Sequence, residues 1–373
     1  MSGQGAHDPG STNVTGEEST IETNDILNRM RPAILRWHDE NARALPWRGE
    51  KDPYRIFVSE IMLQQTRAET VIGYYHAFLS RFPTWQALAD ADVDEVLKCW
   101  EGLGYYSRAR NVFKCAQVVS RELNGQIPRD IKELKKLPGI GDYTAGALAS
   151  MAFGLPEPAI DGNLVRVLSR LFAMDQLVST PASKRQLRED ALQLIDHDRP
   201  GDFNQALMGM GALICVPKKP RCDDCPVCYD CRARALGIEA ALPVLPAIAD
   251  KRIEKRTVAL VFHHDRVLVR KRPDVGLLAG LWEFPNFLEA RTDAAVLEAL
   301  GEMGVRAKKL RSGIQRDHVF THIVWKMAGR LYKSIDGRAT QGQFVDAQTL
   351  LMLAMPTAMK PYRDVALAEI ADQ

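Results

Sequence analysis

Five of the chain's seven cysteines lie within seventeen residues, and this grouping constrains the fold more than any other feature of the sequence. In a long chain without a secretory signal, cysteines so close together hold a metal more often than they form disulfides. Cys215, Cys222, Cys225 and Cys231 are separated by six, two and five residues, a spacing that suits zinc or a [4Fe–4S] cluster. The spacing does not decide between these two kinds of metal centre. It also permits a ligand set that contains Cys228 in place of Cys231.

Apolar residues recur at helical spacing from Ile26 to about Arg234, which predicts an all-α domain of about ten helices over residues 24–236. Cys99 and Cys115 stand among apolar neighbours there and are expected to pack in helices. The Gly-, Ser- and acid-rich residues 1–23 are expected to be disordered.

Prolines and charges without periodicity mark residues 237–255 as an interdomain linker. Beyond it, TVALVFHHDRVLVRKR and HIVWKMAGRLYK carry the β-branched residues of strands, and DAAVLEALGEM between them predicts a helix. Residues 256–373 are therefore predicted to form a smaller α+β domain.

Charge argues against a strongly basic, polyanion-coating protein, and hydropathy argues against a membrane-spanning one. The net charge is only +2, so any surface that binds nucleic acid has to be a local patch. No apolar run approaches the roughly 18 residues of a membrane span, and no signal-peptide core precedes the helical part. We therefore expect a cytoplasmic protein without membrane attachment.

The segment LPGIG (137–141) places Gly139 and Gly141 before an Ala-rich stretch that should be helical through Met151. Glycines allow a tight turn and leave backbone N–H groups open at a helix N-terminus, where a phosphate can bind. An ordinary tight turn has the same pattern, and the glycines alone do not separate the two interpretations.

Several segments together resemble one family. These segments are, in chain order, LPWR (45–48), SEIMLQQT (59–66), GLGYYSRARN (102–111), LPGIGDYTAGA (137–147), IDGNLVRVLSR (160–170) and the cysteine loop 215–231. Through them, from residue 45 to 322, the sequence resembles adenine DNA glycosylases of the MutY type, which belong to the endonuclease III superfamily.

The resemblance implies a multidomain, DNA-bound enzyme. LPGIG becomes a helix-hairpin-helix that holds a DNA phosphate, and the four-cysteine set with Cys231 becomes the ligand set of a [4Fe–4S] cluster. The implied partner is double-stranded DNA with an 8-oxoguanine:A or G:A mispair, bound by a monomer on chromosomal DNA. The basic side chains Lys218, Lys219 and Arg221 between the first two cysteines would contact its backbone.

Cleaving adenine from its sugar needs a proton at the base and a negative charge beside the cationic sugar. Glu60 shares a helical face with Ile56, so an apolar pocket would keep it protonated, although an exposed helix position is the simple alternative. Asp161 would be the carboxylate, and it also has the position of a helix N-cap, whose N–H groups would keep it ionised. By resemblance, Glu60 protonates adenine N7, Asp161 stabilises the sugar cation, and Asn163 and Tyr143 orient the pair.

Tyr143 also predicts the class of reaction. The related glycosylase/lyases have a lysine at this position, which forms a Schiff base, and a phenol cannot. Base excision without strong lyase activity is therefore expected.

Other residues are assigned by resemblance. Gln65 and Tyr105 would wedge into the base stack, although core packing is the simple alternative for Tyr105 and Tyr106. The adenine pocket would consist of Trp47, Arg48, Leu63 and Gln205.

The C-terminal domain resembles a Nudix fold through GLWEFP (280–285) and the helix after it. Its helix keeps Glu298 and Glu302 but has Leu297 and Gly301 where a working Nudix box has Arg and Glu, so nucleotide hydrolysis is not expected. Phe320, Thr321 and His322 match a Phe-Ser-His loop that recognises 8-oxoguanine, with threonine in place of serine. His318 and His322 could in principle share a metal, but no further ligands cluster with them in the sequence.

Two other functions fit parts of the sequence. An endonuclease III-like pyrimidine glycosylase/lyase is disfavoured by Tyr143 and by the C-terminal domain. A mismatch-binding protein without catalysis is disfavoured by the presence of both Glu60 and Asp161.

Overall fold

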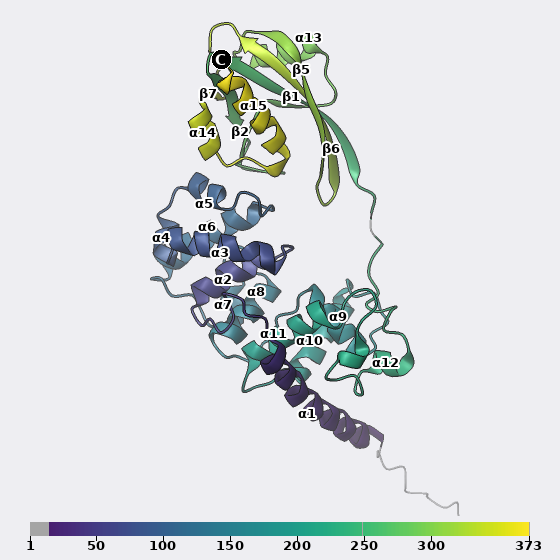
Figure 1. The fold of residues 1–373 in the computed structure, drawn as a ribbon. Coiled ribbons are helices and arrows are strands. Elements are labelled where there is room, and N and C mark those ends of the chain that lie inside the picture. Colours follow the sequence, from purple (N-terminus) through teal and green to yellow (C-terminus); the bar gives the residue numbers. More distant parts are fainter. Residues whose placement is uncertain (1–14, 248, 373) are drawn as a thin grey trace, which may run out of the picture. The chain divides into compact units, whose positions relative to one another are not determined.

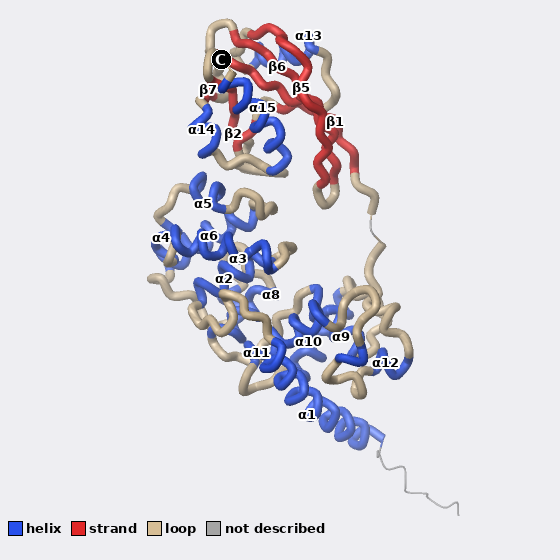
Figure 2. Tube along the Cα trace, in the orientation of Figure 1, coloured by secondary structure: helices blue, strands red, loops and turns tan. Residues whose placement is uncertain are grey.

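The computed structural model describes residues 15–247 and 249–372. Backbone contacts divide the chain into two units: 1–56, 128–135 and 140–246 form the first, and 57–127, 136–139 and 247–373 form the second. The described part of the first unit is helical, whereas the second combines helices with all the named strands (Figures 1 and 2). Among the described residues, no helix is both long and apolar enough to cross a membrane.

The first unit is a helical bundle around one core. Apolar side chains of four helices meet there, with Ile34, Leu168, Leu194 and Phe203 almost completely buried. The core helices are α1 (Thr15–Asn41), α9 (Gly162–Leu171), α10 (Pro181–Leu194) and α11 (Pro200–Leu213). The shorter elements are α7 (Ile131–Leu134), α8 (Asp142–Ala147), a π-helical segment (Leu148–Ala152), a 3₁₀ turn (Cys222–Asp224) and α12 (Arg232–Leu236).

The second unit contains further helices and the sheet. The helices from the first part of the chain are α2 (Pro53–Leu63), whose last turns belong here, α3 (Ala68–Arg81), α4 (Trp85–Ala89), α5 (Val93–Cys99) and α6 (Ser107–Glu122). They meet the C-terminal part through specific contacts: the Tyr106 hydroxyl donates to the Met355 carbonyl at 3.3 Å, and Arg363 pairs with Glu101 at 2.7 Å.

The sheet has the strand order β3-β2-β1-β6-β5, with β4 on β1 and β7 on β2. Only the β1–β6 pair is parallel; all other named pairs are antiparallel. The strands are β1 (Arg252–His263), β2 (Arg266–Lys271), β3 (Trp282–Glu283), β4 (Asn286–Leu288), β5 (Ala307–Val319), β6 (Ile323–Ser334) and β7 (Gln343–Val345).

Helices cover both faces of this sheet, which explains the continuous apolar run of β1. Val258 and Leu260 face α14 (Ala347–Met352), a 3₁₀ turn (Thr357–Met359) and α15 (Lys360–Ala371). Ala259 and Val261 face α13 (Asp293–Glu302) on the other side. A strand buried on both faces has no polar alternation.

The predicted division into a helical part and an α+β part is confirmed, together with the predicted strands and the helix between them. Three boundaries differ. Helix α1 begins at Thr15, inside the stretch expected to be disordered, while residues 1–14 lie outside the described residues. Strand β1 begins at Arg252, inside the expected linker, because it pairs with β6 from its first residue. The start of that linker stays on the first unit, where Val244 accepts from the Val178 N–H.

Arg108 on α6 connects several turns of the second unit through hydrogen bonds from its side chain to backbone carbonyls. It is 7% exposed, and its guanidinium donates to the carbonyls of Ile61, Met62 and Gln64 at 2.8, 3.0 and 2.5 Å. It also donates to Leu103 and Gly104, at 3.1 and 3.2 Å. One side chain thus satisfies the open carbonyls at the end of α2 and in the turn before α6.

Arg108→Leu is expected to lower the free energy of unfolding by roughly 3 kcal/mol, because it leaves several buried carbonyls without donors. Thermal and urea unfolding measure the loss. Arg121→Leu is the matched control, since this exposed arginine of α6 donates one bond, to the Ala89 carbonyl. Equal losses in the two variants would contradict the assignment.

Candidate functional site

Asp161 is the N-cap of α9, as the sequence predicted. Its Oδ1 accepts hydrogen bonds from the backbone N–H groups of Asn163 and Leu164, at 2.9 and 2.8 Å, and its Oδ2 accepts from the Asn163 side-chain amide at 2.8 Å. These donors lower the pKa of the carboxyl, but burial has the larger effect, and the net direction is upward from the usual value. Helix-end donors alone therefore do not set its charge.

Arg166, one turn further along α9, fixes Asn163. Its Nη2 donates to Asn163 Oδ1 at 2.9 Å and to the Gly211 carbonyl at 2.7 Å, while Nε donates to the Cys215 carbonyl at 2.7 Å. The backbone of α11 approaches so closely at Gly211 that an added Cβ would lie 2.7 Å from the Cβ of Asn163. Only glycine fits this position without a shift.

Arg170, a further turn along α9, holds the cysteine loop. It is 2% exposed and donates to Cys215 Sγ at 3.2 Å, to the Val216 carbonyl at 2.9 Å and to the Pro217 carbonyl at 3.1 Å. The sequence analysis missed both arginines. The available signal was a pair of cations four residues apart in the otherwise apolar helix LVRVLSRL, where burial demands fixed partners.

The cysteine thiols surround one cavity. All four predicted ligands line it, and so does Cys228, together with Arg170 and Arg234. Burial raises the pKa of the Cys225 thiol to about 12 and also raises the pKa values of Cys222 and Cys231. Among the described residues, no three Cys, His, Asp or Glu side chains come close enough to hold one ion. Four or more thiols around one cavity are a ligand set that both structural zinc sites and iron–sulfur clusters use.

Lys218, Lys219 and Arg221 are exposed on the same loop, as expected for side chains that contact a polyanion. Lys219 has a φ of +53°, so the loop turns sharply between the first two cysteines. Part of the Arg221 guanidinium is already used within the protein, because it donates to the Leu213 carbonyl at 2.6 Å.

The LPGIG segment is the turn between helices α7 and α8. The helical backbone after it continues to Ala152, as predicted. Only Gly139 adopts a left-handed backbone, with a φ of +81°, and an added Cβ would lie 2.8 Å from Asn111 Cβ. Gly141 is the N-cap of α8 with an ordinary φ of −95°. The two glycines therefore have different roles: the first makes the turn, and the second leaves the helix end open.

The predicted adenine-pocket residues of the first unit lie together. Trp47 is 6% and Gln205 9% exposed, and Arg48 Nη1 donates to Gln205 Oε1. Tyr143, half-buried, is the second residue of α8.

In the second unit, Glu60 is only 4% exposed on α2, so the predicted burial of this carboxyl is confirmed and the exposed alternative is wrong. Leu63, at the end of the same helix, is half-buried.

Gln65 and Tyr105 lie beside the carbonyls that Arg108 holds, and both have left-handed backbones, with φ of +56° and +48°. Each is exposed, whereas Tyr106 is 3% exposed. The two tyrosines therefore differ: core packing is correct for Tyr106 and wrong for Tyr105. Non-glycine residues held in this conformation mark functional sites.

A cavity of about 500 Å³ in the second unit collects most of the predicted recognition residues. Its wall includes Gln65, Tyr105, Phe320, Thr321 and His322. The hydroxyls of Tyr105 and Thr321 form a hydrogen bond of 2.7 Å. Residues more than 200 positions apart in the sequence thus meet at one site.

Comparisons with known proteins identify both parts of the chain. Residues 58–195 match the HhH-GPD superfamily of base excision DNA repair proteins, and residues 257–364 match the NUDIX domain. A solved thermostable thymine-DNA glycosylase is 31% identical, with a TM-score of 0.54, and covers 57% of this chain and 99% of its own.

Two relatives are similar over most of this chain. Human adenine DNA glycosylase is 36% identical over 85% of this chain and 68% of its own length. The fission yeast Schizosaccharomyces pombe protein of the same name is 33% identical over 80% of each. With its buried Glu60, its capping Asp161 and its two matched domains, the chain belongs to the adenine DNA glycosylase family.

Proposed function

We propose that this protein excises adenine paired with 8-oxoguanine, and also with guanine, from double-stranded DNA, and that it does so as a monomer without cutting the strand. The observation that carries the proposal is the Asp161 carboxyl, half-buried at the start of α9 and held by three N–H donors within an adenine glycosylase chain. A carboxyl with fixed orientation beside the sugar is what a cationic sugar intermediate requires.

The two carboxyl groups have opposite tasks. Glu60 is buried on α2 and acts as the general acid, which delivers a proton to adenine N7 so that the base leaves as a neutral group. Asp161 is the anion that stabilises C1′ of the sugar as positive charge develops there. Asn163, locked between Asp161 and Arg166, keeps the carboxylate oriented.

Tyr143 defines the outcome of the reaction. A lysine amine at this helix position would form an imine with C1′ and promote strand cleavage, whereas a phenol cannot. The product is an abasic site in an intact strand.

Adenine has to leave the helix before it can react, and extrusion costs a few kcal/mol. Gln65 and Tyr105 project from strained, exposed positions and fill the space in the stack. Trp47, Arg48, Leu63 and Gln205 receive the extruded base, and the Arg48–Gln205 hydrogen bond supplies polar groups for its edge. The cavity lined by Phe320, Thr321 and His322 receives the oxidised guanine.

The remaining assignments concern docking on the DNA. Cys215, Cys222, Cys225 and Cys231 hold a [4Fe–4S] cluster, whose role is to fix the loop that carries Lys218, Lys219 and Arg221 against the phosphate backbone. The open N–H groups at Gly139–Gly141 hold a second phosphate.

Single-turnover excision from an 8-oxoguanine:A duplex tests the function. The wild type should yield strand breaks only after alkaline treatment, and Glu60→Gln and Asp161→Asn should each reduce excision at least about a thousandfold while duplex binding persists. Cleavage without alkali would indicate a lyase, and binding without any excision a non-catalytic protein. A wild-type rate in either variant would contradict the assigned roles.

The pH dependence of excision follows from Asp161. Its pKa is raised by burial, and the reaction needs the carboxylate, so activity should fall on the acid side at a pH above the ordinary range of an aspartate. Single-turnover rates between about pH 4 and 8 show this limb. Rates that stay constant down to pH 4 would contradict the need for the ionised form.

Purified protein should be yellow-brown and contain about four irons per chain. Arg170→Gln should lower the iron content, because it removes the donor to Cys215 Sγ and to two loop carbonyls. Arg29→Gln is the control, since Arg29 reaches the same loop only through an ion pair with Asp230. Colourless, zinc-containing and active wild type would exclude the cluster.

A further inference from the structure

The tip of the β5–β6 hairpin is the loop Phe320-Thr321-His322, closed by a 2.8 Å hydrogen bond from the Phe320 N–H to the Ile323 carbonyl. Just behind it, His318 of β5 lies opposite Trp325 of β6. Glu254 of β1 lies opposite Trp325 on the other side. Directly paired residues point to the same face of a sheet, so these three side chains form one row across three strands.

An aromatic stack connects the loop to this row. The ring of Phe320 meets His318 at 4.5 Å and Trp325 at 4.9 Å between centroids, with interplanar angles of 67° and 70°. Edge-to-face contacts of this kind have a preferred geometry and resist rotation. Trp325 is completely buried, while Phe320 is half-buried and Thr321 exposed. The stack therefore extends from the buried part of the sheet to the cavity that Phe320, Thr321 and His322 line.

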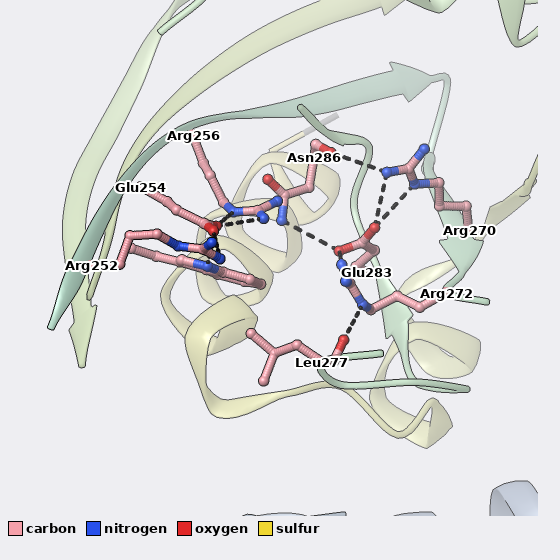
Figure 3. A network of polar contacts seen from close by, with 9 residues as sticks. Arg252, Glu254, Arg256, Arg270, Arg272, Leu277, Glu283 and Asn286 are labelled. Carbon is pink, nitrogen blue, oxygen red and sulfur yellow. Dashed lines mark hydrogen bonds and ion pairs between the residues drawn. The ribbon is translucent and has the colours of Figure 1, made fainter. Parts of the chain in front are cut away.

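Charged groups clamp Trp325 in turn. The Arg256 guanidinium lies over its ring at 4.1 Å, and the indole N–H donates to Glu254 at 3.0 Å. Glu254 also pairs with Arg256, at 2.8 Å, and with Arg252. Figure 3 shows this group beside a second one, in which Arg270 and Arg272 both pair with the buried Glu283. Arg272 lies 5.9 Å from the Trp325 ring and links the two.

The loop backbone is also attached to the start of β1. The Arg252 N–H donates to the His322 carbonyl and Lys251 Nζ to the Phe320 carbonyl, each at 3.0 Å. The Thr321 hydroxyl shares a hydrogen bond with the hydroxyl of Tyr105, which the proposed function assigns to a wedge in the DNA. Once Tyr105 enters the DNA, the loop backbone and the neighbouring Phe320 set the position of Thr321.

We propose that Trp325, clamped by Arg256 and Glu254, is a positioning residue that sets Phe320 and thereby Thr321 for discrimination of 8-oxoguanine from guanine. The inference rests on the proposed function. Trp325 is completely buried, so it would act on the base only through its ring contact with Phe320. A displacement of about 1 Å at a recognition group is enough to lose much of its effect on rate.

The test compares single-turnover excision from 8-oxoguanine:A and G:A duplexes in Arg256→Gln, Trp325→Leu and Trp325→Phe. Arg256→Gln and Trp325→Leu should lower the 8-oxoguanine:A rate about tenfold or more and the G:A rate far less, so that the ratio of the two rates falls. Trp325→Phe keeps a ring under Phe320 and should recover most of the ratio. A merely structural role would lower both rates together.

Arg306→Gln is the control, because it removes an exposed ion pair with Asp336 in the same unit and touches no part of the stack. A wild-type ratio in Arg256→Gln and Trp325→Leu, measured on protein with native melting behaviour, overturns the positioning role. A wild type that excises adenine equally fast opposite both bases overturns the proposed recognition of 8-oxoguanine instead.

Discussion

The hydrogen bonds at the N-terminus of α9 are the constraint on which the proposed chemistry depends. Asp161 closes the open end of this helix, and the helix then places Asn163, Arg166 and Arg170 at intervals of three and four residues on one side. These side chains reach, in order, the carboxylate, the α11 backbone and the first cysteine. A helix of ten residues thus connects the carboxyl of Asp161, the proposed stabiliser of the sugar cation, with the cysteine loop. A displacement at either end of α9 should therefore move the other end as well, because a hydrogen-bonded, packed helix deforms little.

The sequence was sufficient for much of the fold, because periodicity is a local property. The helical spacing up to Arg234, the strand over residues 323–334 and the helix at Asp293–Glu302 all follow from it. Periodicity failed for β5 (Ala307–Val319), whose residues are mostly exposed and which becomes a strand only through pairing with β6. Tertiary pairing overrides local preference at such strands.

The candidate site divides in the same way. Capping by Asp161 was predictable from its neighbours in the chain, whereas periodicity left both a buried and an exposed position open for Glu60. The roles of Arg108, Arg166 and Arg170 were missed, since most of their partners are backbone carbonyls, which carry no side-chain signature. The different environments of Tyr105 and Tyr106 were equally hidden, because adjacent residues point in directions that only the left-handed backbone at Tyr105 decides.

The threonine at position 321 has a consequence for the entropy of recognition. Its β-branched side chain has fewer accessible χ1 rotamers than a serine would have, and in the free protein its hydroxyl is already bonded to Tyr105. In the proposed complex, exchange of the tyrosine hydroxyl for an atom of the damaged base would replace one ordered contact with another. Little rotational freedom would remain to be lost, so under the proposed function the added methyl group preorganises the loop.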